Sequence, residues 1–129
     1  MRPGVITLFL TVLASFLTAC FMGRGPIKPA ITIVSPLNGE QIILDQEIGV
    51  TSLALDDLGI DRVELWVDGR LVRTDSANSG TEERSIEMVQ MWRPTSAGRH
   101  TITVKAYSRS GLSSNPSTVL VQVVPALHP

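Results

Sequence analysis

The sequence predicts an all-β protein, an antiparallel β-sandwich of about seven short strands. Apolar and polar residues alternate in short segments from residue 31 onward, which is the two-residue period of strands with one buried face. Turn-forming residues interrupt these segments at intervals of about ten residues. No segment after the N-terminal apolar run shows the roughly 3.6-residue period of an amphipathic helix.

Turn residues separate the predicted strands in order. Pro36 ends the first strand, because proline has no N–H to donate to a strand ladder. Asp68 and Gly69 join the third strand to the fourth, since Asp-Gly between apolar segments is typical of a tight hairpin. Pro94 and Gly98 separate the fifth strand from the sixth. The predicted strands are residues 31–35, 48–55, 62–67, 71–74, 85–92, 100–107 and 117–124.

The alternation also predicts which side chains form the core. Val63, Leu65 and Val67 share one face of the third strand, and Glu64 and Trp66 share the other. Burying each apolar side chain contributes roughly 1.5–3 kcal/mol before conformational entropy is subtracted. Parity on the other strands adds Ile48, Val50, Ala54, Ile102, Val104, Ala106, Val119, Val121 and Val123 to the predicted core.

The N-terminal residues predict export and lipid attachment. Arg2 precedes an apolar run, residues 5–17, which is the order of a secretory leader. The run closes on Leu17-Thr18-Ala19-Cys20, which resembles the lipobox of bacterial lipoproteins. In that family a peptidase cuts before the cysteine, and its thiol carries a diacylglyceryl group. The resemblance therefore implies a lipid on Cys20, and we predict no other cofactor.

Two alternatives to a lipoprotein leader stay open. The first is an uncleaved transmembrane helix over residues 5–21, a length that is marginal against the roughly 20 apolar residues that a span needs. The second is an ordinary secretory leader followed by an incidental cysteine. Cys20 is the only cysteine, so the chain cannot form an internal disulfide.

Cleavage before Cys20 would leave 110 of the 129 residues, enough for one domain with its own core. It removes one of 11 basic residues and none of 12 acidic ones, so the formal net charge becomes −2. This charge and the lack of a basic run disfavour a nucleic-acid partner. The predicted organisation is a signal peptide over residues 1–19, a lipidated cysteine and flexible tether over 20–30, a sandwich over 31–124 and a C-terminal tail over 125–129.

Three segments resemble bacterial Ig-like domains. Residues 33–39 resemble their opening strand and turn, residues 63–69 their central hairpin, and residues 98–106 their late strands. The resemblance covers residue 31 to about residue 124 and implies an immunoglobulin-like β-sandwich. It also implies that Trp92 fills the core. His100 stands where such domains often carry a tyrosine that hydrogen-bonds across a corner.

The residues do not form a recognisable catalytic arrangement, and we predict that the protein is not an enzyme. No Gly-x-Ser-x-Gly motif surrounds any serine. Asp56, Asp57 and Asp61 cluster around one predicted loop and are weak candidates for a calcium site. The regular spacing of a calcium-binding loop is absent, however, so we predict no metal and assign Asp56 to a turn.

Outward-facing apolar residues are the candidate binding residues. Trp66 lies on the outward parity of its strand, and exposed aromatic side chains are enriched at interfaces and can stack on sugars. Its alternative is a covered position beside Leu71. Four further candidates, which an Ig-like strand order would place on the opposite sheet, are Leu53, Leu55, Val89 and Met91.

These observations predict an extracytoplasmic lipoprotein that is anchored to the cell membrane and works as a protein-interaction or adhesion module. It would face the cell surface, or the periplasm in a cell with two membranes. The expected partner is an envelope protein or a glycan. The alternatives are a carbohydrate- or peptidoglycan-binding module that uses Trp66, and a structural spacer in an envelope assembly.

Overall fold

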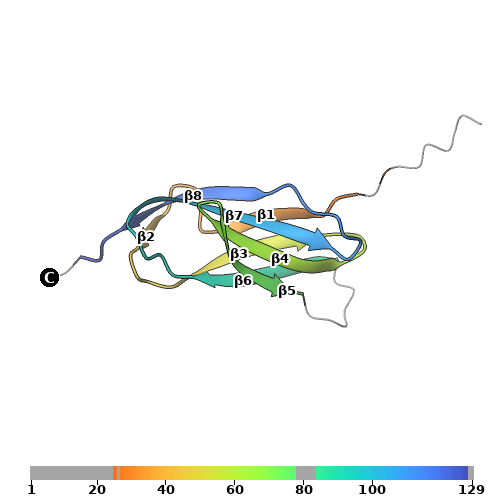
Figure 1. Ribbon diagram of the computed structural model, residues 1–129, viewed down its shortest axis with the longest axis horizontal. Coiled ribbons are helices and arrows are strands. Elements are labelled where there is room, and N and C mark those ends of the chain that lie inside the picture. Colours follow the sequence, from red (N-terminus) through yellow and green to blue (C-terminus); the bar gives the residue numbers. More distant parts are fainter. Residues whose placement is uncertain (1–24, 26, 78–83, 128–129) are drawn as a thin grey trace, which may run out of the picture.

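The computed structural model describes residue 25, residues 27–77 and residues 84–127, which form a two-layered β-sandwich (Figure 1). The described residues make eight strands and no helix, so the all-β sandwich predicted from alternation is confirmed. The predicted lipobox (Leu17, Thr18, Ala19 and Cys20) lies outside the described residues.

Within the described ranges, no helix is long and apolar enough to cross a membrane.

The two sheets differ in width. The narrower one consists of β1 (Ala30–Ser35), β3 (Ile48–Leu55) and β6 (Ser85–Trp92), in the order β1-β3-β6. The wider one has the order β2-β8-β7-β4-β5. Its strands are β2 (Gln41–Ile43), β8 (Ser117–Val124), β7 (Gly98–Ser108), β4 (Ile60–Val67) and β5 (Arg70–Ser76).

The seven predicted strands all occur, and β2 is an addition that the sequence did not reveal. It has three residues and pairs in parallel with β8, from Gln41 opposite Gln122 to Ile43 opposite Val124. Only Ile42 of this strand is buried. A single buried residue in a three-residue segment does not form a recognisable alternating pattern.

The core lies between the inward rows of the two sheets. Val63 and Leu65 on β4 are completely buried, and Trp92 at the end of β6 is buried as well. Ile48 and Val119 are only partly buried and pack against the core. The remaining predicted core residues are buried: Val50, Ala54, Val67, Ile102, Val104, Ala106, Val121 and Val123.

A buried glutamine joins the two sheets at one side of the sandwich. The Nε2 atom of Gln90, on β6, donates to the Val63 carbonyl oxygen at 3.1 Å and to Asp75 Oδ2 at 2.9 Å. Arg73 donates to both carboxylate oxygens of Asp75, at 2.6 and 2.9 Å. The Arg73 bond, supported by Gln90, lowers the pKa of Asp75 despite its partial burial. These bonds hold β6 of the narrower sheet against β4 and β5 of the wider sheet.

The Asp68-Gly69 hairpin is closed onto β7 by the Asp68 side chain. Asp68 and Gly69 have positive φ angles of 51° and 78°, as the predicted turn requires. Asp68 Oδ1 accepts the Thr101 N–H at 2.9 Å, and His100 Nδ1 donates to Asp68 Oδ2 at 2.6 Å. His100 Nε2 lies 2.8 Å from the Ser96 carbonyl oxygen. Where related domains carry a tyrosine, this histidine therefore bonds to two neighbouring turns.

Both ring nitrogens of His100 face acceptors, which favours the doubly protonated ring. Burial opposes the charge, but the bonds to Asp68 and to the Ser96 carbonyl outweigh it and raise the pKa of His100 above its ordinary 6.5. Burial also opposes ionisation of Asp68, but the Thr101 N–H and His100 outweigh it and lower the pKa of Asp68 below 3.8.

These two shifts predict a stability maximum at weakly acidic pH. The His100 contribution is complete below pH 6.5 and is lost as the pH rises through its raised folded-state pKa, whereas the Asp68 contribution is lost as the pH falls below 3.8. Because half of the Asp68 side chain is exposed, we expect about 1 kcal/mol or less. Urea denaturation between pH 5 and pH 9 should show a decline that His100→Gln removes. An equal decline in the variant would contradict the assignment.

The burial difference between two leucines on neighbouring strands gives a second prediction. Leu65 is completely buried on β4, so Leu65→Ala should lower the free energy of unfolding by about 2–5 kcal/mol. Leu71 on β5 is 49% exposed, so Leu71→Ala should change it by about 0.5 kcal/mol or less. Urea denaturation of both variants measures this, and similar losses would show that the inward row is wrongly assigned.

Candidate binding surface

Exposed apolar side chains gather on the outer face of the three-stranded sheet. Their exposed fractions are 38% for Leu53, 46% for Leu55, 54% for Val89 and 39% for Met91. Leu53 and Leu55 come from β3, and Val89 and Met91 come from β6. All four point outward, in keeping with their parity. Val34 on β1, beside a register shift, is also exposed, at 50%, and it was not among the predicted binding residues.

A glycine brings two of these side chains close together. Gly49 on β3 lies opposite Met91 in the strand register. A Cβ added at this glycine would lie 2.8 Å from Val89 Cγ1 and 3.7 Å from Met91 Sδ. Val89 and Met91 therefore lean over the bare backbone of β3. The sequence reasoning missed Gly49, since only the register brings it beside Val89 and Met91.

One carboxylate interrupts the apolar surface. Glu87 lies opposite Leu53 in the register and is exposed. No hydrogen bond or ion pair joins it to another described residue. We call Val34, Leu53, Leu55, Val89 and Met91, together with Glu87, the apolar face. Its chemistry suits a partner with an apolar surface and a basic group that meets Glu87.

Trp66 lies on the other sheet, facing away from the apolar face. It lies opposite Leu71 on β5 and Thr103 on β7, and its side chain is half-buried. Its Nε1 atom is buried and has no hydrogen-bond partner among the described residues. On the same outer surface, the Arg62 guanidinium lies 3.8 Å above the Tyr107 ring. This surface therefore offers no fully open aromatic ring on which a sugar could stack.

Two of the three aspartates weighed as calcium ligands have other contacts. Asp56 Oδ2 accepts the Leu58 N–H at 2.9 Å, which is the turn role expected for it. Asp61 Oδ2 lies 3.1 Å from Arg62 Nη1, and Asp57 is exposed. Across the part of the chain that the structure describes, no three His, Cys, Asp or Glu side chains are grouped so that they could hold a metal ion.

Comparison with solved structures shows the fold. The fibronectin(III)-like modules of Clostridium thermocellum CbhA are 24% identical, with a TM-score of 0.66; the match covers 82% of this chain and 53% of that one. The CARDB domain of PF1109 from Pyrococcus furiosus is 15% identical, with a TM-score of 0.59 and coverage of 75% and 94%. The SrpA adhesin of Streptococcus sanguinis is 15% identical, with a TM-score of 0.53 and coverage of 79% and 58%.

Comparison with sequences is informative at the level of the family. No curated protein matches the chain. Residues 29–104, more than half of the chain, match the family described as "Bacterial Ig domain". This match agrees with the all-β fold of two packed sheets. The chain belongs to the bacterial Ig domain family.

Proposed function

We propose that this chain is a lipid-anchored extracytoplasmic protein whose Ig domain binds a partner protein through the apolar face. The observation that carries the proposal is the gathering of five exposed apolar side chains on one side of the three-stranded sheet. Contiguous exposed apolar surface is uncommon on monomeric domains and marks interaction sites. The fold likeness to a streptococcal adhesin supports a role at the cell surface.

The charge on the apolar face favours a different protein over a second copy of this chain. Three strands about 4.8 Å apart, of six, eight and eight residues with a rise of about 3.4 Å per residue, give a flat surface on the order of 400 Å². A stable interface needs roughly 800 Å² from each partner. A partner of either kind would therefore also contact residues around the apolar face. Two copies that met face to face would place two Glu87 carboxylates on one interface, whereas a different protein can present a basic group there.

The proposed anchor would hold the domain near the membrane with the apolar face accessible. Cys20 lies ten residues before Ala30, the first residue of β1, so the tether reaches at most roughly 35 Å. β1 begins at the end of the sandwich opposite to the end where β8 finishes (Figure 1). The anchored end would therefore carry residues 56–59, and the Asp68-Gly69 hairpin would point away from the membrane.

A pull-down with two matched leucine variants tests the proposal. The full chain in detergent is immobilised and exposed to envelope extract, beside Leu53→Asp and Leu120→Asp. These two leucines are 38% and 40% exposed, on opposite sheets. We expect Leu53→Asp to lose the retained protein at least tenfold, because it buries a charge in the interface. Leu120→Asp should retain it.

The same experiment with Trp66→Ala separates the protein partner from a glycan. If Trp66→Ala abolishes retention and Leu53→Asp does not, binding uses the five-stranded sheet and the apolar face is not the site. Quenching of Trp66 fluorescence by soluble peptidoglycan fragments would then identify a sugar ligand.

A substitution at the proposed lipidation site tests the anchor. We expect that Cys20→Ser prevents incorporation of labelled fatty acid, and incorporation into this variant would exclude Cys20 as the lipidation site.

A further inference from the structure

We propose that β6 pairs with an extended strand of the partner protein along its free edge. This inference rests on the proposed function and specifies how the partner is held. It predicts backbone hydrogen bonds to β6, with partner side chains that continue the apolar face on one side and enter a cavity on the other.

Among the four edge strands described, β6 is the one that is long, regular and unprotected. Its eight residues pair with β3 without a register shift, and it contains neither proline nor lysine. The other edges carry features that discourage pairing with another chain. The register of β1 shifts between Ile33 and Ser35, β2 has three residues, and β5 has a register shift and the charged residues Arg70 and Arg73.

The register shows which backbone groups of β6 face the open edge. Asp56 N–H donates to the Arg84 carbonyl oxygen at 2.9 Å, directly beyond the last paired residues of β3 and β6. In an antiparallel ladder the hydrogen-bonded pairs alternate, so the even-numbered residues of β6 bond to β3. The N–H and C=O groups of Ser85, Glu87, Val89 and Met91 therefore point away from β3, on the side where the described residues form no further strand.

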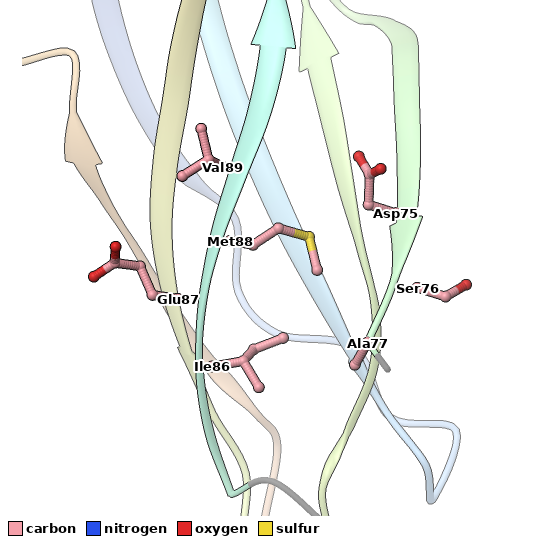
Figure 2. A pocket seen from close by; sticks show the side chains of 7 residues that line it. All are labelled: Asp75, Ser76, Ala77, Ile86, Glu87, Met88 and Val89. Atoms are coloured by element: carbon pink, nitrogen blue, oxygen red, sulfur yellow. The ribbon is translucent and has the colours of Figure 1, made fainter. Parts of the chain in front are cut away.

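Space for an added strand exists because β5 extends beyond β6. Gln90 on β6 bonds to both β4 and β5, and every residue of β5 except Asp75 is exposed. A cavity of about 240 Å³ lies between the two edges (Figure 2). Met88 extends into it from β6, whereas Glu87 and Val89 point to the outer side. The cavity is lined by Asp75, Ser76, Ala77, Ile86, Glu87, Met88 and Val89.

The same geometry excludes a second copy of this chain as the occupant. If two β6 edges paired about a twofold axis, each β5 would extend under the β6 of the other copy. It would then occupy the space that the other copy's β4 and β5 already fill. A lone extended segment has no such neighbour. The unpaired carboxylate of Glu87 lies beside the free edge, so the segment should carry lysine or arginine opposite it.

Selection from a random ten-residue peptide library on phage, with the full chain in detergent as the target, provides a defined probe. Enriched peptides should alternate apolar residues and contain a lysine or arginine. When synthesised, they should slow hydrogen–deuterium exchange at the amides of Glu87, Val89 and Met91. Protection elsewhere, or a library that yields no enriched peptide, would overturn the inference.

Two substitutions at one position separate backbone pairing from side-chain contact. Val89→Pro removes an N–H that faces the open edge and no hydrogen bond to β3, so it should weaken peptide binding at least tenfold. Val89→Thr keeps the N–H and the branched shape but adds a hydroxyl to the apolar face, so its loss of affinity measures the side-chain contribution. Val89→Pro should bind the peptides at least tenfold more weakly than Val89→Thr does. If Val89→Pro does not fold, Glu87→Lys provides the test, because it should weaken binding of basic peptides by a similar factor. Unchanged affinity in a folded Val89→Pro variant, or in Glu87→Lys, would overturn the inference.

The pull-down distinguishes failure of this inference from failure of the proposed function. If Leu53→Asp loses the retained protein and Val89→Pro keeps it, the apolar face binds the partner without strand addition. If both variants keep it, the proposed function itself fails.

Discussion

The unequal width of the two sheets is the constraint on which the rest of the structure depends. Five strands face three, so the narrower sheet cannot cover the inner side of β5. Gln90 marks where that cover ends, because its amide bonds to the β4 backbone and to Asp75 on β5. Charged residues occupy the uncovered part of β5, where Arg73 holds Asp75. β6, the strand of the narrower sheet nearest to β5, is the last strand of its sheet and has backbone groups that no described strand pairs with.

The same asymmetry separates two kinds of surface. The outer face of the wide sheet mixes polar side chains with exposed apolar ones such as Leu71 and Leu120, and its tryptophan is half-buried beside Leu71. The outer face of the narrow sheet carries apolar side chains on all three strands and one unpaired carboxylate. Apolar area of this kind favours association when a partner covers it, and the carboxylate selects the charge of that partner. Sequence parity predicted that these residues face outward, but it did not predict that Trp66 is less exposed than they are.

Local pattern predicted most of the fold, and contacts between distant residues account for what it missed. The period of two identified the inward rows of β3, β4 and β7, because burial on one face is recorded in every second residue. Its failure at β2 reflects a strand of three residues that is defined by its pairing with β8. His100 is a similar case. Its bonds reach Asp68, 32 residues away, and Ser96, 4 residues away, in two different turns. The residue type at position 100 alone does not predict these bonds.

Photo-crosslinking in living cells tests most directly whether the apolar face is the binding surface. A benzophenone amino acid is placed at Leu53 or at Leu120 in the full chain, two leucines of similar exposure on opposite sheets. The account predicts one discrete crosslinked protein from Leu53 and none from Leu120. Crosslinks from Leu120 alone, or the same products from both positions, would contradict it.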